Sequence, residues 1–343
     1  MKCINKFSSV ILILCVALST LSGCGDNKDT AMADLWMPFS EYTSGERVTT
    51  GRSSIIEHSE YDNRIDGFSK SFTVFSGNVS NGDFENSLAR AALLIDLNDN
   101  EVLYADNAFE KMYPASITKL MTALLSVKYL SKDSLITVTA EVNESITDPT
   151  AVMLELEEGD YMTLDQALRL MLLSSYNDVA VAIGCQISGS VEAFGELMTE
   201  EAKALGCTGT SFKNASGLHD DDHYTTAYDL YLIFKEVIKD PYLLEIIQMK
   251  EYNTVIHYKD GTEREVGSVN TNRYFRGTYE APSNIYVVGG KTGSTEEAGR
   301  CLMIMVRDTQ SNPYIAVVLG AENTPDLYTE MTDLLSLCES SVN

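Results

Sequence analysis

A serine and a lysine three residues apart can form a nucleophile with its own base. Ser116 and Lys119 lie in Pro114-Ala115-Ser116-Ile117-Thr118-Lys119, which holds the only Ser-x-x-Lys of the chain. On a helix opened by the proline, positions i and i+3 share a face, so Lys119 can reach Ser116. A serine hydroxyl is a weak nucleophile until a base takes its proton, and lysine is such a base only when its pKa is lowered. The segment therefore predicts acyl transfer.

A second segment, Lys291-Thr292-Gly293, is suited to binding an anionic or extended ligand. It occurs once and follows an apolar run that predicts a strand. Lys291 would supply positive charge, Gly293 would let the backbone approach a ligand closely, and a strand edge can bind an extended peptide. Taken alone, a solvated turn with a surface lysine explains this segment equally well.

A third pattern, Ser-x-Asn, is common and must be chosen by its context. It begins at Ser76, Ser175, Ser268 and Ser341. We select Ser175-Tyr176-Asn177, because it follows the nucleophile in the chain and lies between two predicted helices. The other three lie in a polar N-terminal region, in a segment without a strong anchor, and at the C-terminus.

The three patterns occur in the order Ser-x-x-Lys, Ser-x-Asn and Lys-Thr-Gly, which is shared by β-lactamases and penicillin-binding proteins. From about residue 87 to its end, the chain resembles the low-molecular-weight penicillin-binding proteins that are serine D-Ala-D-Ala carboxypeptidases. The centre of Ser-x-Asn departs from the family, which usually has a small residue where this chain has Tyr176. Further matching segments are Phe212–Leu218, His223–Leu230, Gly290–Thr295 and Ala298–Leu302.

The resemblance implies that Ser116 attacks the carbonyl between two terminal D-alanines of a peptidoglycan stem peptide. Backbone N–H groups of Ser116 and Ser294 would form the oxyanion hole. The leaving D-alanine would be protonated through Ser175 and Lys119, and water would hydrolyse the acyl-enzyme. β-Lactam antibiotics would acylate the same serine as inhibitors.

The substrate itself would contact a second group of residues. By resemblance, Asn177 would hold the peptide, and Lys291 and Thr292 would bind its terminal carboxylate. Neither a metal nor an organic cofactor is implied.

Three alternatives remain open. A β-lactamase would use the same nucleophile, but no convincing Glu-x-x-x-Asn lies between the Ser-x-Asn and Lys-Thr-Gly motifs. A non-catalytic wall-binding or penicillin-sensing protein would not need Ser116 and Lys119. A metal site at His219-Asp220-Asp221-Asp222-His223 lacks the His-Glu-x-x-His arrangement, and the segment matches the penicillin-binding pattern.

The pattern of apolar residues predicts one α+β domain of the β-lactamase/DD-peptidase type, with an antiparallel sheet built from both chain ends around a helical region. A hairpin is expected over 91–105, and Thr163 with Gln166 forms a capping box. Helices are expected at 190–205, 226–238, 241–249 and 326–338, and strands at 72–75, 285–288, 302–306 and 314–319.

The N-terminus predicts export. Two lysines precede an apolar run that is too short to span a bilayer, and Leu21-Ser22-Gly23-Cys24 resembles a bacterial lipobox. We expect a signal peptide at 1–23, a lipid on Cys24, a polar tether at 24–85 and the peptidase domain at 86–343. This places the protein on the outer face of the cytoplasmic membrane of a bacterium. The alternative is an ordinary signal peptide with an incidental cysteine.

Charge and cysteines narrow the function further. With 50 acidic and 25 basic residues, the net charge is −25. An acidic field repels phosphate backbones, which argues against nucleic acid as a partner. Beyond the lipobox, four cysteines (Cys185, Cys207, Cys301 and Cys338) permit two disulfides, but their apolar neighbours favour free thiols.

Overall fold

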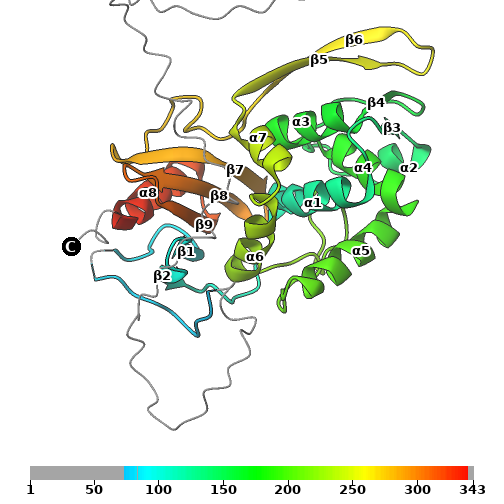
Figure 1. Cartoon of the computed structure of the whole chain (residues 1–343). Coiled ribbons are helices and arrows are strands. Elements are labelled where there is room, and N and C mark those ends of the chain that lie inside the picture. The colour runs from blue at the N-terminus through cyan, green and yellow to red at the C-terminus, as the bar shows by residue number, and fades with distance from the viewer. Residues whose placement is uncertain (1–72, 83, 339–343) are drawn as a thin grey trace, which may run out of the picture. The chain divides into compact units, whose positions relative to one another are not determined.

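The computed structural model describes residues 73–82 and 84–338. They form an α+β domain in which a five-stranded antiparallel sheet adjoins a helical region (Figure 1). The sheet takes its first two strands from the start of the domain and the others from its end, as the sequence predicted. In spatial order the strands are β2 (Glu101–Asp106), β1 (Ala91–Asp96), β9 (Pro313–Ala321), β8 (Gly299–Asp308) and β7 (Ile285–Thr295).

The sheet is covered on both faces, and β8 shows why. Its side chains alternate between two apolar clusters, because successive residues of a strand point to opposite faces. Leu302 and Ile304 pack with the C-terminal helix, whereas Met303 and Met305 join the core shared with the helical region. The sheet is therefore a central layer between α8 and the remaining helices (Figure 1).

The helical region supplies most of the larger core. The predicted capping box is confirmed: the Thr163 hydroxyl accepts from the Gln166 N–H, and the Gln166 side chain accepts from the Thr163 N–H. The helices predicted after residue 190 are confirmed to within two or three residues. The helices are α1 (Lys119–Tyr129), α2 (Ala140–Glu144), α3 (Leu164–Ser174), α4 (Asn177–Ser188), α5 (Val191–Ala204), α6 (Ala227–Val237), α7 (Pro241–Gln248) and α8 (Thr324–Leu335).

A second, four-stranded sheet was not predicted. It has the order β3 (Leu135–Thr137), β4 (Tyr161–Thr163), β5 (Glu251–His257) and β6 (Glu263–Val269). The β5–β6 hairpin extends away from the helices (Figure 1). Its strands are mostly exposed or half-buried, so they lack the apolar runs by which the other strands were recognised.

The first described residues already contact the domain. Val79 pairs with Ala105 through two backbone hydrogen bonds, and the Phe75 ring lies against those of Phe109 and Tyr228. The strand expected at 72–75 is wrong for residues 73–75, which are irregular, and residue 72 lies outside the described residues. The predicted leader, with Cys24, also lies outside them.

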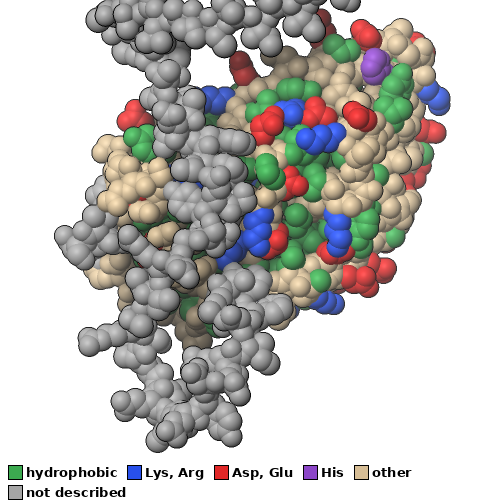
Figure 2. All heavy atoms as spheres, in the orientation of Figure 1, with side chains coloured by type: hydrophobic (Ala, Val, Ile, Leu, Met, Phe, Trp, Pro, Cys, Tyr) green, Lys and Arg blue, Asp and Glu red, His purple; other side chains and the backbone are tan. Residues whose placement is uncertain are grey.

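The cysteines of the described part of the chain are buried. Cys185, Cys207 and Cys301 are free, buried thiols, and Cys338 is buried as well. No helix within 73–82 and 84–338 has both the length and the apolarity needed to cross a bilayer. Acidic and basic side chains are interspersed on the face seen in Figure 2.

Candidate active site

Ser116 lies in a tight turn at the junction of the sheet and the helices. The prediction of an α-helix opening at Pro114 needs correction, because residues Ala115–Thr118 form a 3₁₀ turn and α1 begins only at Lys119. Ala115 has φ +47°, a left-handed conformation that is uncommon for residues other than glycine. The turn presents Ser116 just before α1, where the helix dipole favours developing negative charge.

Lys119 is fully buried beneath the nucleophile. Its Nζ lies 2.9 Å from Ser116 Oγ, 2.8 Å from Asn177 Oδ1 and 2.7 Å from the carbonyl oxygen of Ser216. The amide and carbonyl oxygens can only accept hydrogen bonds, so they occupy two N–H groups of the amine. The third tetrahedral position faces Ser116. In the neutral amine this position is a lone pair, directed at the serine proton.

The surroundings of Lys119 favour that neutral form. Burial lowers its pKa well below the usual value, the nearby charge of Lys291 lowers it further, and Asp178 opposes the shift. Burial disfavours an ammonium group because no water solvates it. The site thus holds a serine in contact with a lysine that is suited to act as a base.

Lys291 is the second buried lysine of the site, at 1% exposure on the edge strand β7. Its Nζ donates to Ser175 Oγ at 3.0 Å and to the carbonyl of Thr292 at 3.1 Å. Burial lowers its pKa to about 7. Thr292 Oγ1 donates to Thr271 Oγ1 at 2.6 Å. The Lys-Thr-Gly motif lies within β7 itself and is not a loop between two strands.

Two glycines allow neighbouring backbone to pack closely against the 3₁₀ turn Ala115–Thr118, called the nucleophile turn below. A Cβ on Gly293 would lie 2.7 Å from the Pro114 carbonyl and 3.2 Å from the Ser116 nitrogen. A Cβ on Gly217 would lie 1.9 Å from the Ala115 carbonyl. Gly293 thus makes room for the turn, and it also lines the smaller pocket beside Ser116, so its expected close approach to a ligand stays a prediction. This contact places the β7 backbone, with Ser294 next in sequence, beside the Ser116 N–H.

The Ser175-Tyr176-Asn177 segment joins α3 to α4. Ser175 ends α3 in the left-handed conformation at φ +67°, and Asn177 begins α4. Asn177 Nδ2 donates to the Val152 carbonyl, which orients the amide so that its oxygen faces Lys119. The Ser175 hydroxyl contacts Lys291, whereas proton transfer through Ser175 would require contact with Lys119 as well. Tyr176 packs partly against the core.

The other Ser-x-Asn patterns lie elsewhere. Ser268 Oγ is 2.6 Å from Ser174 Oγ, on the hairpin side of α3. In the pattern beginning at Ser76, Asn78 binds Asp106 near the N-terminal edge of the domain. Ser341 lies outside the described residues.

Three contributors to the site were not predicted as such. The Ser216 carbonyl binds Lys119, although its segment was noted only for its family pattern. His223 Nε2 lies 2.9 Å from Thr118 Oγ1, and its Nδ1 accepts from the Lys213 N–H at 3.1 Å, so it ties the nucleophile turn to the 213–217 loop. Burial lowers the His223 pKa to about 3, which keeps the ring neutral.

The third contributor is Asp178, a buried carboxylate at the start of α4. It accepts backbone N–H groups of Leu154 and Leu156 at 3.0 and 3.2 Å. These bonds fix the loop whose Val152 carbonyl orients Asn177. In the sequence, His223 was noted only as the first residue of a matching family segment and in the rejected metal pattern, and Asp178 only follows the Ser-x-Asn motif.

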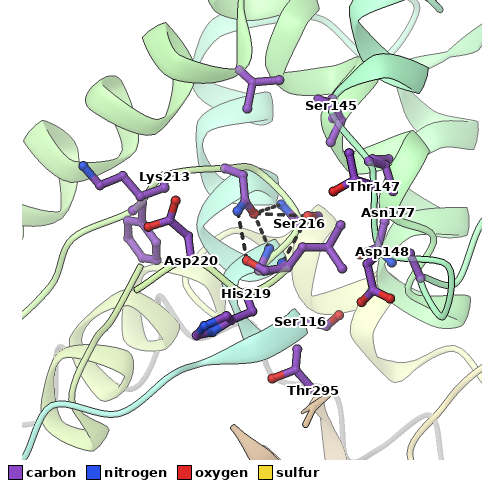
Figure 3. A pocket seen from close by; sticks show the side chains of 18 of the residues that line it. Ser116, Ser145, Thr147, Asp148, Asn177, Lys213, Ser216, His219, Asp220 and Thr295 are labelled. Carbon is purple, nitrogen blue, oxygen red and sulfur yellow. Dashed lines mark hydrogen bonds between the residues drawn. The ribbon is translucent and has the colours of Figure 1, made fainter. Parts of the chain in front are cut away.

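Ser116 opens onto two cavities. A cleft of about 1020 Å³ is lined by Asn177, Ser216 and the 145–152 loop, with Thr295 near Ser116 at one end and Ser145 far from it (Figure 3). A smaller pocket of about 310 Å³ also contains Ser116, together with Thr292. Tyr176 is absent from the lining of both cavities. Within the described residues, no three His, Cys, Asp or Glu side chains converge as metal ligands do.

The sequence of the chain is similar to those of D-alanyl-D-alanine carboxypeptidases. The family described as D-alanyl-D-alanine carboxypeptidase matches residues 79–323. A D-alanyl-D-alanine carboxypeptidase of Bacillus subtilis is 34% identical over 74% of this chain and 62% of its own length. One from Escherichia coli is 30% identical over 72% of this chain and 60% of its own. The chain thus spans about three fifths of these relatives.

Two kinds of solved structure show the same fold. Streptomyces K15 DD-transpeptidase matches with a TM-score of 0.68 at 24% identity, covering 75% of this chain and 98% of that one. Penicillin-binding protein D2 from Listeria monocytogenes, in its cefotaxime-bound form, matches with a TM-score of 0.59 at 27% identity, covering 73% and 96%.

Proposed function

This chain belongs to the D-alanyl-D-alanine carboxypeptidase family, and we propose that it removes the terminal D-alanine from peptidoglycan stem peptides through an acyl-enzyme on Ser116. One observation carries the proposal. The Lys119 amine is buried, its pKa is lowered, and its Nζ lies 2.9 Å from Ser116 Oγ. Its two N–H groups are bound by the Asn177 amide oxygen and the Ser216 carbonyl oxygen. A binding protein needs no such pair.

The reaction begins with proton transfer from Ser116 Oγ to the Lys119 lone pair. The oxygen attacks the carbonyl between the two terminal D-alanines, and the negative charge develops beside the N–H groups of Ser116 and Ser294. The C–N bond then breaks, and the Lys119 proton passes to the leaving amine. Water, deprotonated by the same lysine, releases the shortened peptide and restores Ser116.

The other motif residues hold the substrate in place. β7 is an edge strand, so a stem peptide can lie along its Lys291-Thr292-Gly293-Ser294 segment by adding a strand. Asn177 lines the larger cleft and orients Lys119, which places it between base and substrate. β-Lactams fit the same position as inhibitors, because their strained amide presents a carbonyl to Ser116.

The direct test is release of D-alanine from a pentapeptide ending in D-Ala-D-Ala. We expect the wild type to release it, penicillin to block release, and Ser116→Ala to lose both release and covalent labelling by fluorescent penicillin. Fast β-lactam hydrolysis without D-alanine release would instead show a β-lactamase. Absence of labelling and release would show a non-catalytic protein.

An endopeptidase is the second candidate among peptidases, since one from Pseudomonas aeruginosa is 30% identical over 72% of this chain and 75% of its own length. Cross-linked dimeric stem peptides assayed beside the pentapeptide separate the two activities. Cleavage of the cross-link in preference to release of D-alanine would overturn the carboxypeptidase assignment.

We further propose that the protein is exported and anchored by a lipid on Cys24. The support is the sequence Leu21-Ser22-Gly23-Cys24 directly after a short apolar run. Mass spectrometry of the native protein should find a diacylglyceryl group on an N-terminal Cys24, and Cys24→Ala should abolish it. An unmodified N-terminus at another residue would contradict the anchor.

A further inference from the structure

The backbone of Leu154 is bound through both of its polar groups by charged side chains. Its N–H donates to the Asp178 carboxylate at 3.0 Å, and its carbonyl accepts from the Arg264 guanidinium at 2.9 Å. Asp178 belongs to α4, whereas Arg264 lies on β6, in the hairpin that extends away from the helices (Figure 1). Hydrogen bonds to charged groups are stronger than those between neutral groups. This short segment is therefore fixed between two elements that are distant in the sequence.

Asp178 holds more of this backbone than a single residue. It is fully buried, and the N–H groups of Leu154, Leu156 and Val179 donate to it. Burial raises its pKa, and these hydrogen bonds oppose the rise. A protonated carboxyl would need an acceptor for its own proton, whereas all three groups are donors, so the contacts favour the ionised form. Asp178 therefore binds three backbone groups at once and places a negative charge inside the domain.

The segment held in this way, residues 152–156, determines how the Asn177 amide is turned. The Val152 carbonyl accepts from the backbone N–H of Asn177 at 2.8 Å and from its Nδ2 at 3.1 Å. The amide oxygen is thereby left facing Lys119, at 2.8 Å from Nζ. A reversed amide has nearly the same shape, but its Nδ2 would donate to the lone pair of Lys119 that must take the serine proton. The orientation of one amide thus decides whether the base is available.

Asp178 also acts on Lys119 through its charge. Burial and the charge of Lys291 lower the pKa of Lys119, and the negative charge of Asp178 opposes them. His223, bound to the same 3₁₀ turn, is neutral because burial lowers its pKa to about 3. Arg264, by contrast, reaches the base only through the backbone. Loss of Asp178 should therefore change both the position and the pKa of the base, whereas loss of Arg264 should change the position alone.

We propose that Asp178 and Arg264 form a clamp that positions the base Lys119. The clamp holds the 152–156 segment, and that segment keeps the oxygen of Asn177 turned towards the amine. Neither charged residue lines the two cavities at the nucleophile, so both act through the base and not through the substrate. The inference rests on the proposed acyl-enzyme mechanism, and it assigns a role to a residue of the β5–β6 hairpin, which none of the three motifs includes.

The test is the rate of penicillin acylation of the whole protein as a function of pH, followed by intact mass. Arg264→Met keeps a long side chain but has no donor, so the plateau rate should fall by about 10- to 100-fold while the acidic limb stays in place. Arg264→Lys retains a donor and should recover part of the rate. Asp178→Asn should lower the plateau as well, and it should move the acidic limb to lower pH, because Lys119 loses the charge that raises its pKa.

Two neighbouring residues provide matched controls outside both cavities. Arg307 donates to the Ser311 carbonyl, so Arg307→Met removes an arginine bound to backbone, as Arg264→Met does. Asp308 is a buried carboxylate that accepts the backbone N–H groups of Gln310 and Asn312, so Asp308→Asn matches Asp178→Asn. Both controls should keep the wild-type plateau and limb, and thermal unfolding midpoints show which variants are folded.

A folded Arg264→Met protein that is acylated at the wild-type rate would overturn the proposal. An Asp178→Asn protein whose acidic limb stays at the wild-type pH would overturn it too. If Asp178→Asn does not fold, the comparison of Arg264→Met with Arg264→Lys still decides, because the clamp requires the donor. A wild type that penicillin does not acylate would instead defeat the proposed function.

Discussion

The two buried lysines of the site are the same residue in two different settings. Lys119 contacts three groups from separate parts of the chain: Ser116 in the 3₁₀ turn, Asn177 at the start of α4 and the Ser216 carbonyl in the 213–217 loop. Lys291 contacts one serine and a carbonyl of its own strand. Burial lowers both pKa values.

The two lysines differ in where the remaining hydrogen-bonding position of each amine points. Burial makes either lysine easier to deprotonate, but only Lys119 directs its remaining valence at Ser116. The Lys291 charge acts at a distance, since it further lowers the pKa of Lys119. A buried lysine is therefore suited to act as a base only where its acceptors leave a lone pair directed at the serine, and burial is a condition that the two lysines share.

The largest expected effect is the loss of the base. Lys119→Arg keeps the positive charge but cannot deprotonate, so acylation by penicillin should fall by about 10²- to 10⁴-fold. Lys128→Arg, on an exposed face of the same helix, should acylate at the wild-type rate. Stopped-flow or quench measurements give both constants, and thermal unfolding midpoints show whether the Lys119 variant is folded. Near-normal acylation by a folded Lys119→Arg protein would mean that another group is the base.

A smaller effect is expected when only the distant charge is removed. Lys291→Ala takes away the repulsion that helps to keep Lys119 neutral, so the pKa of Lys119 should rise. The acidic limb of the pH profile for acylation should therefore move to higher pH than in the wild type. Lys239→Ala, which removes a surface charge paired with Glu236, should leave the limb where it is. If the limb does not move in Lys291→Ala, the charge of Lys291 does not lower the pKa of Lys119.

The smallest effect concerns stability. Lys291 has a folded-state pKa of about 7 against 10.5 in an unfolded chain, so the unfolded state binds an extra proton between these values. The stability of the wild type should therefore rise with pH over this window, and the cost of burial is fully present below pH 7. Lys291→Met should raise the unfolding midpoint at pH 7 by about 2–4 °C, equivalent to about 1 kcal/mol, and the gain should shrink towards pH 10. A gain that is constant with pH would contradict the lowered pKa of Lys291 in the folded state.

Much of the framework was predictable from the sequence. The Ser-x-x-Lys, Ser-x-Asn and Lys-Thr-Gly segments lie together as their order indicated, and the apolar runs located the five-stranded sheet and the later helices. These features were predictable because they are formed by residues that are close together in the sequence, where their spacing can be read directly.

The remainder depends on contacts between distant segments. The Ser216 carbonyl reaches Lys119 across 97 positions of the chain, and no side-chain pattern marks a backbone acceptor. The neutral His223 bridge and the close fit of Gly293 against the nucleophile turn arise only when β7, α1 and the 213–217 loop are packed together. The β5–β6 hairpin was missed because its strands are too exposed to carry an apolar signal.

The central claim is that Lys119 is a neutral amine when Ser116 is acylated. The most direct measurement is the rate of penicillin acylation as a function of pH, followed by intact mass, with peptide mapping to locate the adduct. We expect an adduct on Ser116 and a rate that rises with pH to a plateau, with a midpoint well below the lysine value of 10.5. A midpoint near 10.5, or an adduct on another residue, would contradict it.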